Sequence, residues 1–280
     1  MLNDITFGQY YPAESFVHKM DPRAKILFTV AFIVLSFVAR NALGMLAAAV
    51  LMVGLTLLSR VPFKMYLKTL KPILPVIALT SLINALYVSS GTRLFQFWKI
   101  TVTSGGVLTA VYMSTRIILL IFCSSMLTYT TTPTQLTDAI ERLLSPLKLI
   151  KIDVHSLAMM MTIALRFIPT LIEETEKIMS AQKARGANLE SGGLTSRIRA
   201  LIPVLIPLLI SSFRRASELA DAMECRCYHG GEGRTRMICY KIGGRDLLVL
   251  LTLALFFAGV IAANLYGDGV LFGLLQEYVL

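Results

Sequence analysis

Arg185 and Arg226 are the residues of this sequence whose type and setting favour a specific polar contact with another molecule. An arginine offers five hydrogen-bond donors in a rigid fork that fits carboxylates and carbonyl groups. Each of the two arginines lies at the end of a long amphipathic stretch and has small residues on both sides. A helix end of this kind is narrow and could enter a groove on a partner. The candidate docking residues at the two tips are Ala184, Arg185, Gly186, Cys225, Arg226 and Cys227.

A single arginine in the last turn of a helix has a simpler explanation. Its positive charge interacts favourably with the helix dipole and stabilises the helix by about 0.3–1 kcal/mol. The repetition of the pattern favours docking over that alternative. We therefore expect both tips to be exposed on one side of the molecule, where truncation of a docked arginine costs about 2 kcal/mol or more of binding energy.

The second tip has Cys227 where the first has Gly186, a residue that suits a left-handed helix stop. Because cysteine lacks the conformational freedom of glycine, we expect the stop of the second helix to move to Gly230–Gly231. A metal site is the alternative use of these thiols, and its candidate ligands are Cys225, Cys227, His229 and Cys239. Their spacing lacks the paired Cys-x-x-Cys hooks of a zinc site, so neither a metal nor a cofactor is predicted.

Three helices are expected to position the tips. The first begins at residue 132 and ends before Pro146, since threonine can cap a helix and proline suits its first turn. The second runs from about residue 154 past Pro169 to Arg185, and the third from about residue 195 past Pro207 to Arg226. Apolar residues recur every three or four positions, so these helices can lie in a membrane interface or cross and bury their faces together. Pro169 and Pro207, near the start of each stripe, are predicted to be structural.

The composition indicates a membrane protein, because 55% of the residues are hydrophobic and the net charge is +10. Nearly uncharged runs of about 17–25 residues are long enough to cross a bilayer, and the first lies too far into the chain for a cleaved signal. The runs cover residues 24–39, 42–58, 72–90, 105–127 and 247–265. The predicted fold is an all-α integral membrane protein with about five transmembrane helices and a cytoplasmic set of long crossed helices.

The predicted organisation has three regions. Residues 1–128 hold four transmembrane helices, residues 129–245 form a cytoplasmic helical region, and residues 246–280 form a last transmembrane helix and a tail. Lysines and arginines gather before the first span, between the second and third, and above all in residues 129–245. Because basic residues concentrate on the cytoplasmic side, the N-terminus is expected inside and the C-terminus outside.

Arg116 lies near the middle of the fourth predicted span, where an ionisable group costs about 2.5–3.5 kcal/mol on insertion scales. No carboxylate in the spans stands out as its partner. A structural role, in which the guanidinium pairs with backbone carbonyls near a helix crossing, is favoured over a role in transport.

Other function classes lack their residues in this sequence. There is no His-Glu-x-x-His, no nucleophile and base in a recognisable motif and no Walker-type phosphate loop, so a membrane enzyme is not predicted. Membrane topology accounts for the basic charge, and aromatic interleaving is lacking, so nucleic-acid binding is not predicted either. The remaining alternative is a permease that binds its own solute, which Pro72 and Pro75 favour only weakly.

Several stretches resemble the transmembrane T component of energy-coupling factor transporters, the vitamin and metal-ion importers of bacteria and archaea that paired ABC-type ATPases power. They are HKMDPRAK at residues 18–25, TTTPT at 130–134, ALRFIPT at 164–170 and both arginine tips. The resemblance covers nearly the whole chain, and the pairing of ALRFIPT with AQKARG is very specific. It implies an EcfT-type subunit of a bacterial plasma membrane.

The resemblance also implies the partners. Arg185 and Arg226 would end coupling helices that dock into grooves on two ATPase subunits, and the unequal tips suit two different ATPases. A separate S component would bind the substrate, and the apolar faces of the coupling helices would carry it and move it. The residues expected to contact the S component are Leu136, Ile140, Leu143, Leu144, Met160, Ile172, Ile178, Met179, Ile210 and Phe213. The sequence leaves the substrate open, and it favours an S component of the shared, multi-vitamin type only weakly.

Overall fold

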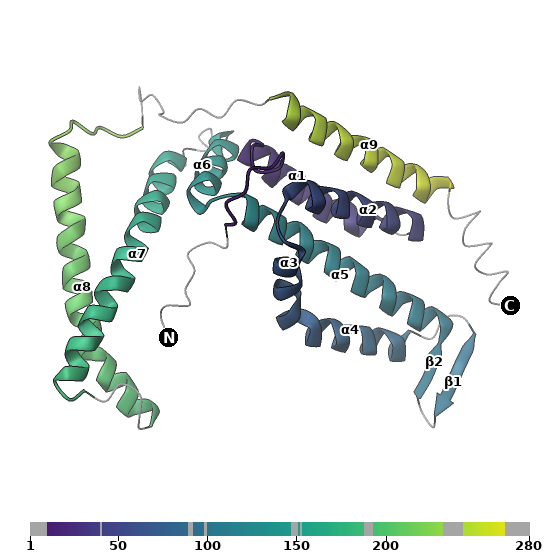
Figure 1. Ribbon diagram of the computed structural model, residues 1–280, viewed down its shortest axis with the longest axis horizontal. Coiled ribbons are helices and arrows are strands. Elements are labelled where there is room, and N and C mark those ends of the chain that lie inside the picture. Colours follow the sequence, from purple (N-terminus) through teal and green to yellow (C-terminus); the bar gives the residue numbers. More distant parts are fainter. Residues whose placement is uncertain are drawn as a thin grey trace. The chain divides into compact units, whose positions relative to one another are not determined.

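The computed structural model describes residues 10–39, 41–88, 92–97, 100–146, 151, 153–187, 193–231 and 243–266. Its helices are α1 (Pro22–Val38), α2 (Ala42–Ser59), α3 (Phe63–Leu70), the 3-10 turn η1 (Lys71–Ile73), α4 (Leu74–Tyr87), α5 (Ser104–Thr130), α6 (Pro133–Leu143), α7 (Val154–Ala184), α8 (Leu194–Glu224) and α9 (Gly244–Tyr266). Two short strands, β1 (Arg93–Phe97) and β2 (Ile100–Thr103), complete the described elements (Figure 1). Apart from this short ribbon, the predicted all-α membrane fold is confirmed.

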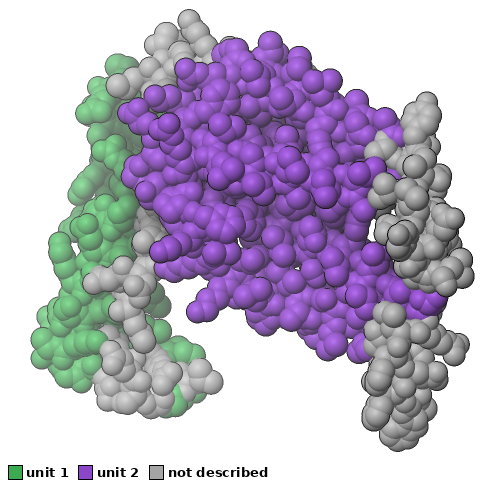
Figure 2. Space-filling model, turned by 45° about the vertical axis from the view of Figure 1, so that its right-hand side comes forward, with its two compact units in different colours: residues 1–7, 133–239 green, residues 8–132, 240–280 purple. Residues whose placement is uncertain are grey.

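The chain divides into two compact units, which Figure 2 shows in different colours. Unit 1 comprises residues 1–7 and 133–239, and unit 2 comprises residues 8–132 and 240–280. Unit 1 contains α6, α7 and α8, whereas unit 2 contains the remaining helices and both strands. The chain passes from one unit to the other after residue 132 and returns after residue 239.

Among the described residues, 6 helical segments are long and apolar enough to cross a membrane. Four of them overlap the predicted spans: α2, the bent segment formed by α3, η1 and α4, α5 and α9. The remaining predicted span corresponds to α1, which is slightly shorter at 17 residues. The other two segments lie in α7 and α8, whose length and composition would also allow a crossing.

The core of unit 2 lies among α1, α2, α5 and α9, which pack side by side (Figure 1). Phe28 and Phe32 of α1 are buried there against residues from the other helices. At one end the close approach of α4 to α5 requires a glycine, since a Cβ on Gly106 would lie 2.8 Å from the carbonyl oxygens of Ala85 and Val88. Helices α1, α2, α5 and α9 of unit 2 therefore form a packed bundle.

Two parts of unit 2 differ from the sequence prediction. The basic segment after the second span forms the short helix α3, and the chain then turns at η1, where Pro72 occupies the first turn, before α4 begins. The segment between the third and fourth predicted spans contains the antiparallel ribbon of β1 and β2. Its sequence is rich in aromatic and β-branched residues, which favour strands.

Candidate functional site

Helices α7 and α8 pair within unit 1 through polar contacts near their middles. The Glu174 carboxylate of α7 accepts a short hydrogen bond from the Ser211 hydroxyl and an ion-pair hydrogen bond of 2.8 Å from Arg215, both of α8. Farther along, Nε2 of Gln182 donates to the carbonyl of Pro203 at 3.4 Å. Later residues of α7 thus face earlier residues of α8, so the two helices run antiparallel.

The prolines lie inside these helices rather than at their starts. Pro169 interrupts α7, and Pro203 and Pro207 interrupt α8. Because a proline has no N–H, Pro207 leaves the carbonyl four residues earlier without its helical partner. That carbonyl belongs to Pro203, the group that accepts the hydrogen bond from Gln182. Pro207 therefore makes a backbone acceptor available for a contact between the helices.

The two helices end in the same hydrogen-bonded stop. At the first tip the Gly186 N–H donates to Lys183 O at 3.0 Å and the Ala187 N–H donates to Gln182 O at 2.9 Å. At the second tip the equivalent bonds run from Cys227 to Glu224 O at 2.8 Å and from Tyr228 to Met223 O at 3.1 Å.

Both patterns are Schellman motifs, in which one residue takes a left-handed conformation. The left-handed residues are Gly186, with φ of 86°, and Cys227, with φ of 55°. The expectation that the second stop moves to Gly230–Gly231 is therefore wrong. The two closing hydrogen bonds hold Cys227 in the left-handed region despite the cost of its Cβ, which is about 1–2 kcal/mol for residues other than glycine.

Each arginine directly precedes the left-handed residue of its tip, and both side chains are exposed. Their small neighbours, Ala184, Gly186, Cys225 and Cys227, are exposed as well. The fourth potential metal ligand, Cys239, lies outside the described residues, so the metal alternative stays untested. The candidate docking residues thus form two accessible helix ends.

The two tips lie at opposite ends of the helix pair (Figure 1). Arg185 is about 11 residues beyond Glu174 on α7, and Arg226 is about 15 residues beyond Ser211 on α8, at about 1.5 Å per residue. Because the helices run antiparallel, these lengths place the tips roughly 30–40 Å apart. The sequence predicted two exposed tips, and their exposure is observed, whereas the separation of the tips was not predicted. The expectation that both tips lie on one side of the molecule stays a prediction.

The chain behind the second tip is braced against the start of α7. A Cβ on Gly231 would lie 2.4 Å from Cδ2 and 2.6 Å from Cγ of His155, so only a glycine fits against that ring. Nδ1 of His155 lies 3.1 Å from Oε1 of Glu141 in α6. At the first tip, by contrast, a Cβ on Gly186 or Gly193 would meet nothing within 4 Å. The described residues therefore support the two tips unequally.

Asp153 caps the N-terminus of α7 beside this brace. Its carboxylate accepts hydrogen bonds from the Ser156 N–H, at 3.1 Å, and from the Ser156 hydroxyl. These bonds lower the pKa of Asp153. A carboxylate that stays ionised at a helix N-terminus complements the helix dipole, so the start of α7 is fixed locally.

Among the described residues of unit 1, an apolar face is exposed. On α8 the exposed side chains recur at intervals of three and one: Ile198, Leu201, Ile202, Leu205, Ile206, Leu209, Ile210 and Phe213. Of the residues predicted to contact an S component, Ile140, Leu144, Met160, Ile210 and Phe213 are exposed, and Leu136, Leu143, Ile172, Ile178 and Met179 are half-buried. An exposed apolar stripe of this length is typical of a protein or membrane contact.

The comparisons with known proteins agree with this architecture. Residues 13–237 match the CbiQ family, which is described as a cobalt transport protein. A relative from Ruminiclostridium cellulolyticum is 48% identical over 93% of this chain and 97% of its own length. That relative is named energy-coupling factor transporter transmembrane protein EcfT. The chain belongs to the EcfT family. Two further relatives have the same name: one from Acidaminococcus fermentans is 50% identical over 91% of this chain and 96% of its own length, and one from Bacillus subtilis is 43% identical over 92% and 97%.

In this EcfT-family chain Arg116 contacts the end of α1. Its Nη2 donates to the carbonyl of Ala39 at 3.0 Å, and its guanidinium lies 5.6 Å and 5.5 Å from the ring centroids of Phe37 and Tyr112. The Tyr112 hydroxyl donates to Asn41 O at 2.5 Å. The guanidinium and the phenol together bind the backbone of the turn between α1 and α2, which supports a structural role for Arg116.

A buried polar network at the opposite end of unit 2 was missed by the sequence analysis. Lys25, Asp21 and Asp246 are charged residues that are nearly fully buried. Lys25 and Asp246 each lie at the edge of an apolar run in the sequence. A charged residue at such a position is usually interpreted as solvated, so the burial of these two was not predicted. Their partners come from distant parts of the chain and could not be inferred from spacing.

Proposed function

We propose that this chain is the coupling subunit of an importer, which transmits ATP-driven motion from two ATPase subunits to a separate substrate-binding membrane protein. The observation that carries the proposal is the pair of exposed arginines, Arg185 and Arg226, at identical helix stops. Two such ends, roughly 30–40 Å apart on the estimate from helix rise, suit two sockets on a dimer of ATPases.

The ATPases are proposed to supply all of the catalysis, since the sequence contains no phosphate-binding loop. The tips differ in their flanking residues, and only the second is braced through Gly231 and His155 among the described residues. These differences favour two non-identical ATPases over two copies of one.

The uncovered apolar face of α6, α7 and α8 is proposed as the surface for the substrate-binding S component. Apolar side chains such as Ile210 and Phe213 would be covered by a partner with an apolar surface within or next to the bilayer. Motion of the tips would alter the crossing of α7 and α8 at Glu174 and so tilt the bound partner. The substrate is proposed to be a vitamin or a metal ion.

The chain is proposed to lie in a bacterial plasma membrane with its N-terminus and unit 1 at the cytoplasmic side. The concentration of lysines and arginines in residues 129–245 supports this orientation. It places the arginine tips in the compartment that holds ATP. The three regions of the chain, bounded at residues 128 and 245, stay a prediction.

The test is affinity purification of the chain from native membranes in mild detergent. We expect two different ATPases in equal amounts and at least one small membrane protein that binds a vitamin or a metal ion. Several such membrane proteins would indicate the shared type, and a single one the dedicated type. Recovery of the chain without any ATPase would overturn the proposal.

The alternative is a permease that binds its own solute, for which the break at η1 between α3 and α4 is the only favourable observation within the described residues. Uptake of a solute by proteoliposomes that contain this chain alone would support that alternative. Uptake that requires the copurified partners and ATP would exclude it.

A further inference from the structure

The chain crosses between the two units twice. On the side of unit 2, both crossings lie next to the same short segment. The chain leaves unit 2 after residue 132, just beyond the end of α5, and returns at residue 240, just before α9 begins. Residues 18–25, which lead into α1, contact both places. These contacts lie entirely within unit 2.

Lys25 binds the outgoing end of the chain. Its Nζ donates to the carbonyl of Thr130 at 2.8 Å, to the hydroxyl of Thr131 at 3.4 Å and to the carbonyl of His18 at 3.3 Å. The side chain is buried, with a relative exposure of 2%. The ammonium group thus closes the C-terminus of α5, where a positive charge is favourable.

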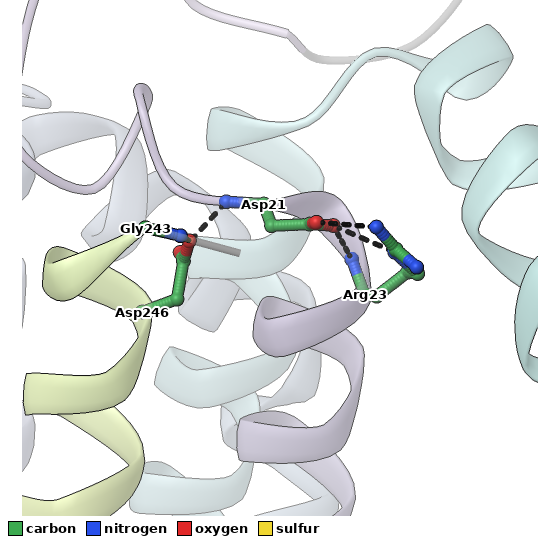
Figure 3. A network of polar contacts seen from close by, with 4 residues as sticks. All are labelled: Asp21, Arg23, Gly243 and Asp246. Atoms are coloured by element: carbon green, nitrogen blue, oxygen red, sulfur yellow. Dashed lines mark hydrogen bonds and ion pairs between the residues drawn. The ribbon is translucent and has the colours of Figure 1, made fainter. Parts of the chain in front are cut away.

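Asp246 binds the incoming end of the chain. Its Oδ2 accepts from the Gly243 N–H at 2.8 Å, and its Oδ1 accepts from the Asp21 N–H at 2.8 Å (Figure 3). The relative exposure of Asp246 is 3%. One carboxylate therefore ties the first turn of α9 to the residue that caps α1.

Asp21 completes the network. Its carboxylate caps α1 by accepting from the Arg23 N–H at 2.9 Å and forms an ion pair with the Arg23 guanidinium, also at 2.9 Å (Figure 3). Asp21 and Asp246 bring two negative charges into the same buried region as the Lys25 ammonium. A buried charge that loses its partners is strongly unfavourable, so each contact of this network constrains the others.

We propose that residues 18–25, through Lys25 and Asp21 with Asp246, form a common anchor that makes both passages between the units move together. Resting on the proposed function, this assigns Lys25 and Asp246 as positioning residues for coupling. A force on the tips of unit 1 then reaches unit 2 at two points held on one rigid segment. Without the anchor, the end of α5 and the start of α9 move independently and ATP hydrolysis is no longer matched by transport.

The test uses the intact complex, purified with its partners and reconstituted in liposomes, with the variants Lys25→Met and Asp246→Asn. Radiolabelled riboflavin, folate and Co²⁺ serve as transport probes, and the probe that the wild type imports is used. Three quantities are measured: the subunit composition, the rate of ATP hydrolysis and the amount imported per ATP hydrolysed. Lys19→Met and Glu14→Gln are the matched controls. These two residues form an exposed ion pair with each other, Lys19 within the segment and Glu14 just before it, and neither belongs to the buried network.

We expect both anchor variants to keep the full subunit composition and ATP hydrolysis close to that of the wild type. Import per ATP is expected to fall about tenfold or more, a change in the range found for coupling networks, whereas the controls import normally. Unchanged import per ATP in both anchor variants overturns the proposal. If Lys25→Met does not accumulate in the membrane, the result for Asp246→Asn decides between the outcomes. If neither variant accumulates, the network serves folding alone and the proposal is overturned.

These outcomes are separate from those that test the proposed function. A wild-type complex without ATPases refutes the coupling role itself, before any variant is compared. A wild-type complex that imports a probe with ATP, together with variants that import it equally well, refutes only the anchor.

Discussion

Gly186 and Cys227 occupy the same backbone position at the ends of α7 and α8. Both residues have positive φ, 86° and 55°, and both follow an arginine and precede the N–H that closes the motif. The conformation is free of strain for glycine and unfavourable for cysteine. The two tips therefore have the same geometry at different energetic cost.

The first prediction concerns this cost. Cys227→Gly is expected to stabilise the second tip by up to about 1 kcal/mol. Glycine removes the strain of about 1–2 kcal/mol, but it loses about 0.5–1 kcal/mol more backbone entropy on folding. Hydrogen exchange of the Tyr228 amide, which donates to Met223 O, is the local measurement and should slow by up to about fivefold. Gly186→Ala is the counterpart and should speed the exchange of the Ala187 amide, and an effect of the same sign in both variants would contradict the account.

The second prediction concerns the brace behind Arg226. In Gly231→Ala the new Cβ would overlap the His155 ring, so the chain behind the second tip must shift. The ATPase at the second tip is expected to bind more weakly, and the one at the first tip is expected to bind normally. Binding of each purified ATPase to the detergent-solubilised chain measures this.

Gly193→Ala is the matched control, because a Cβ there meets nothing within 4 Å. Equal binding of both ATPases to the Gly231 and Gly193 variants would show that the brace has no part in docking.

The third prediction concerns Arg116. Arg116→Leu removes the hydrogen bond to Ala39 O and the stacking on Phe37 and Tyr112. A hydrogen bond to a charged group contributes about 1.5–3 kcal/mol, so the melting temperature of the purified chain should fall. Tyr112→Phe, which removes only the phenol hydroxyl, should cause a smaller fall. A complex that is stable and fully assembled but unable to import would instead assign Arg116 a direct part in transport.

The fourth prediction concerns the contact between Glu174 and Arg215 where α7 and α8 meet. A double-mutant cycle with Glu174→Gln and Arg215→Gln is expected to give a coupling energy of about 1 kcal/mol or less, since both side chains are partly exposed. The larger effect should be on geometry. Spin labels near Arg185 and Arg226 should show a broader distance distribution in Glu174→Gln, and an unchanged distribution would mean that apolar packing alone sets the crossing.

Local sequence rules identified most of the elements of this fold. The apolar runs located the transmembrane helices of unit 2, and the amphipathic stripes located α6, α7 and α8, because both signals depend on neighbouring residues. The stop at Cys227 was missed because propensity favours glycine there, whereas the observed stop depends on two backbone hydrogen bonds. The helical bend at η1 and the ribbon of β1 and β2 were also missed.

The spacing of residues along the sequence does not predict contacts between residues that are far apart in the chain. Asp21 and Asp246 are joined across most of the chain, and Glu174 pairs with Arg215 rather than with a neighbour on its own helix. The separation of the tips follows from the antiparallel pairing of α7 and α8, which no periodicity in either helix specifies. Tertiary packing decides such features, so they required the structure.

The most direct test of the account is the binding of the ATPases to a chain that carries Arg185→Glu together with Arg226→Glu. Lys177→Glu and Arg214→Glu are the matched controls, since both residues are exposed on the same two helices away from the tips. The account predicts that the double tip variant accumulates normally in the membrane but retains neither ATPase, whereas both controls retain the two. Retention of both ATPases by the double tip variant would contradict the account, because docking would then occur elsewhere.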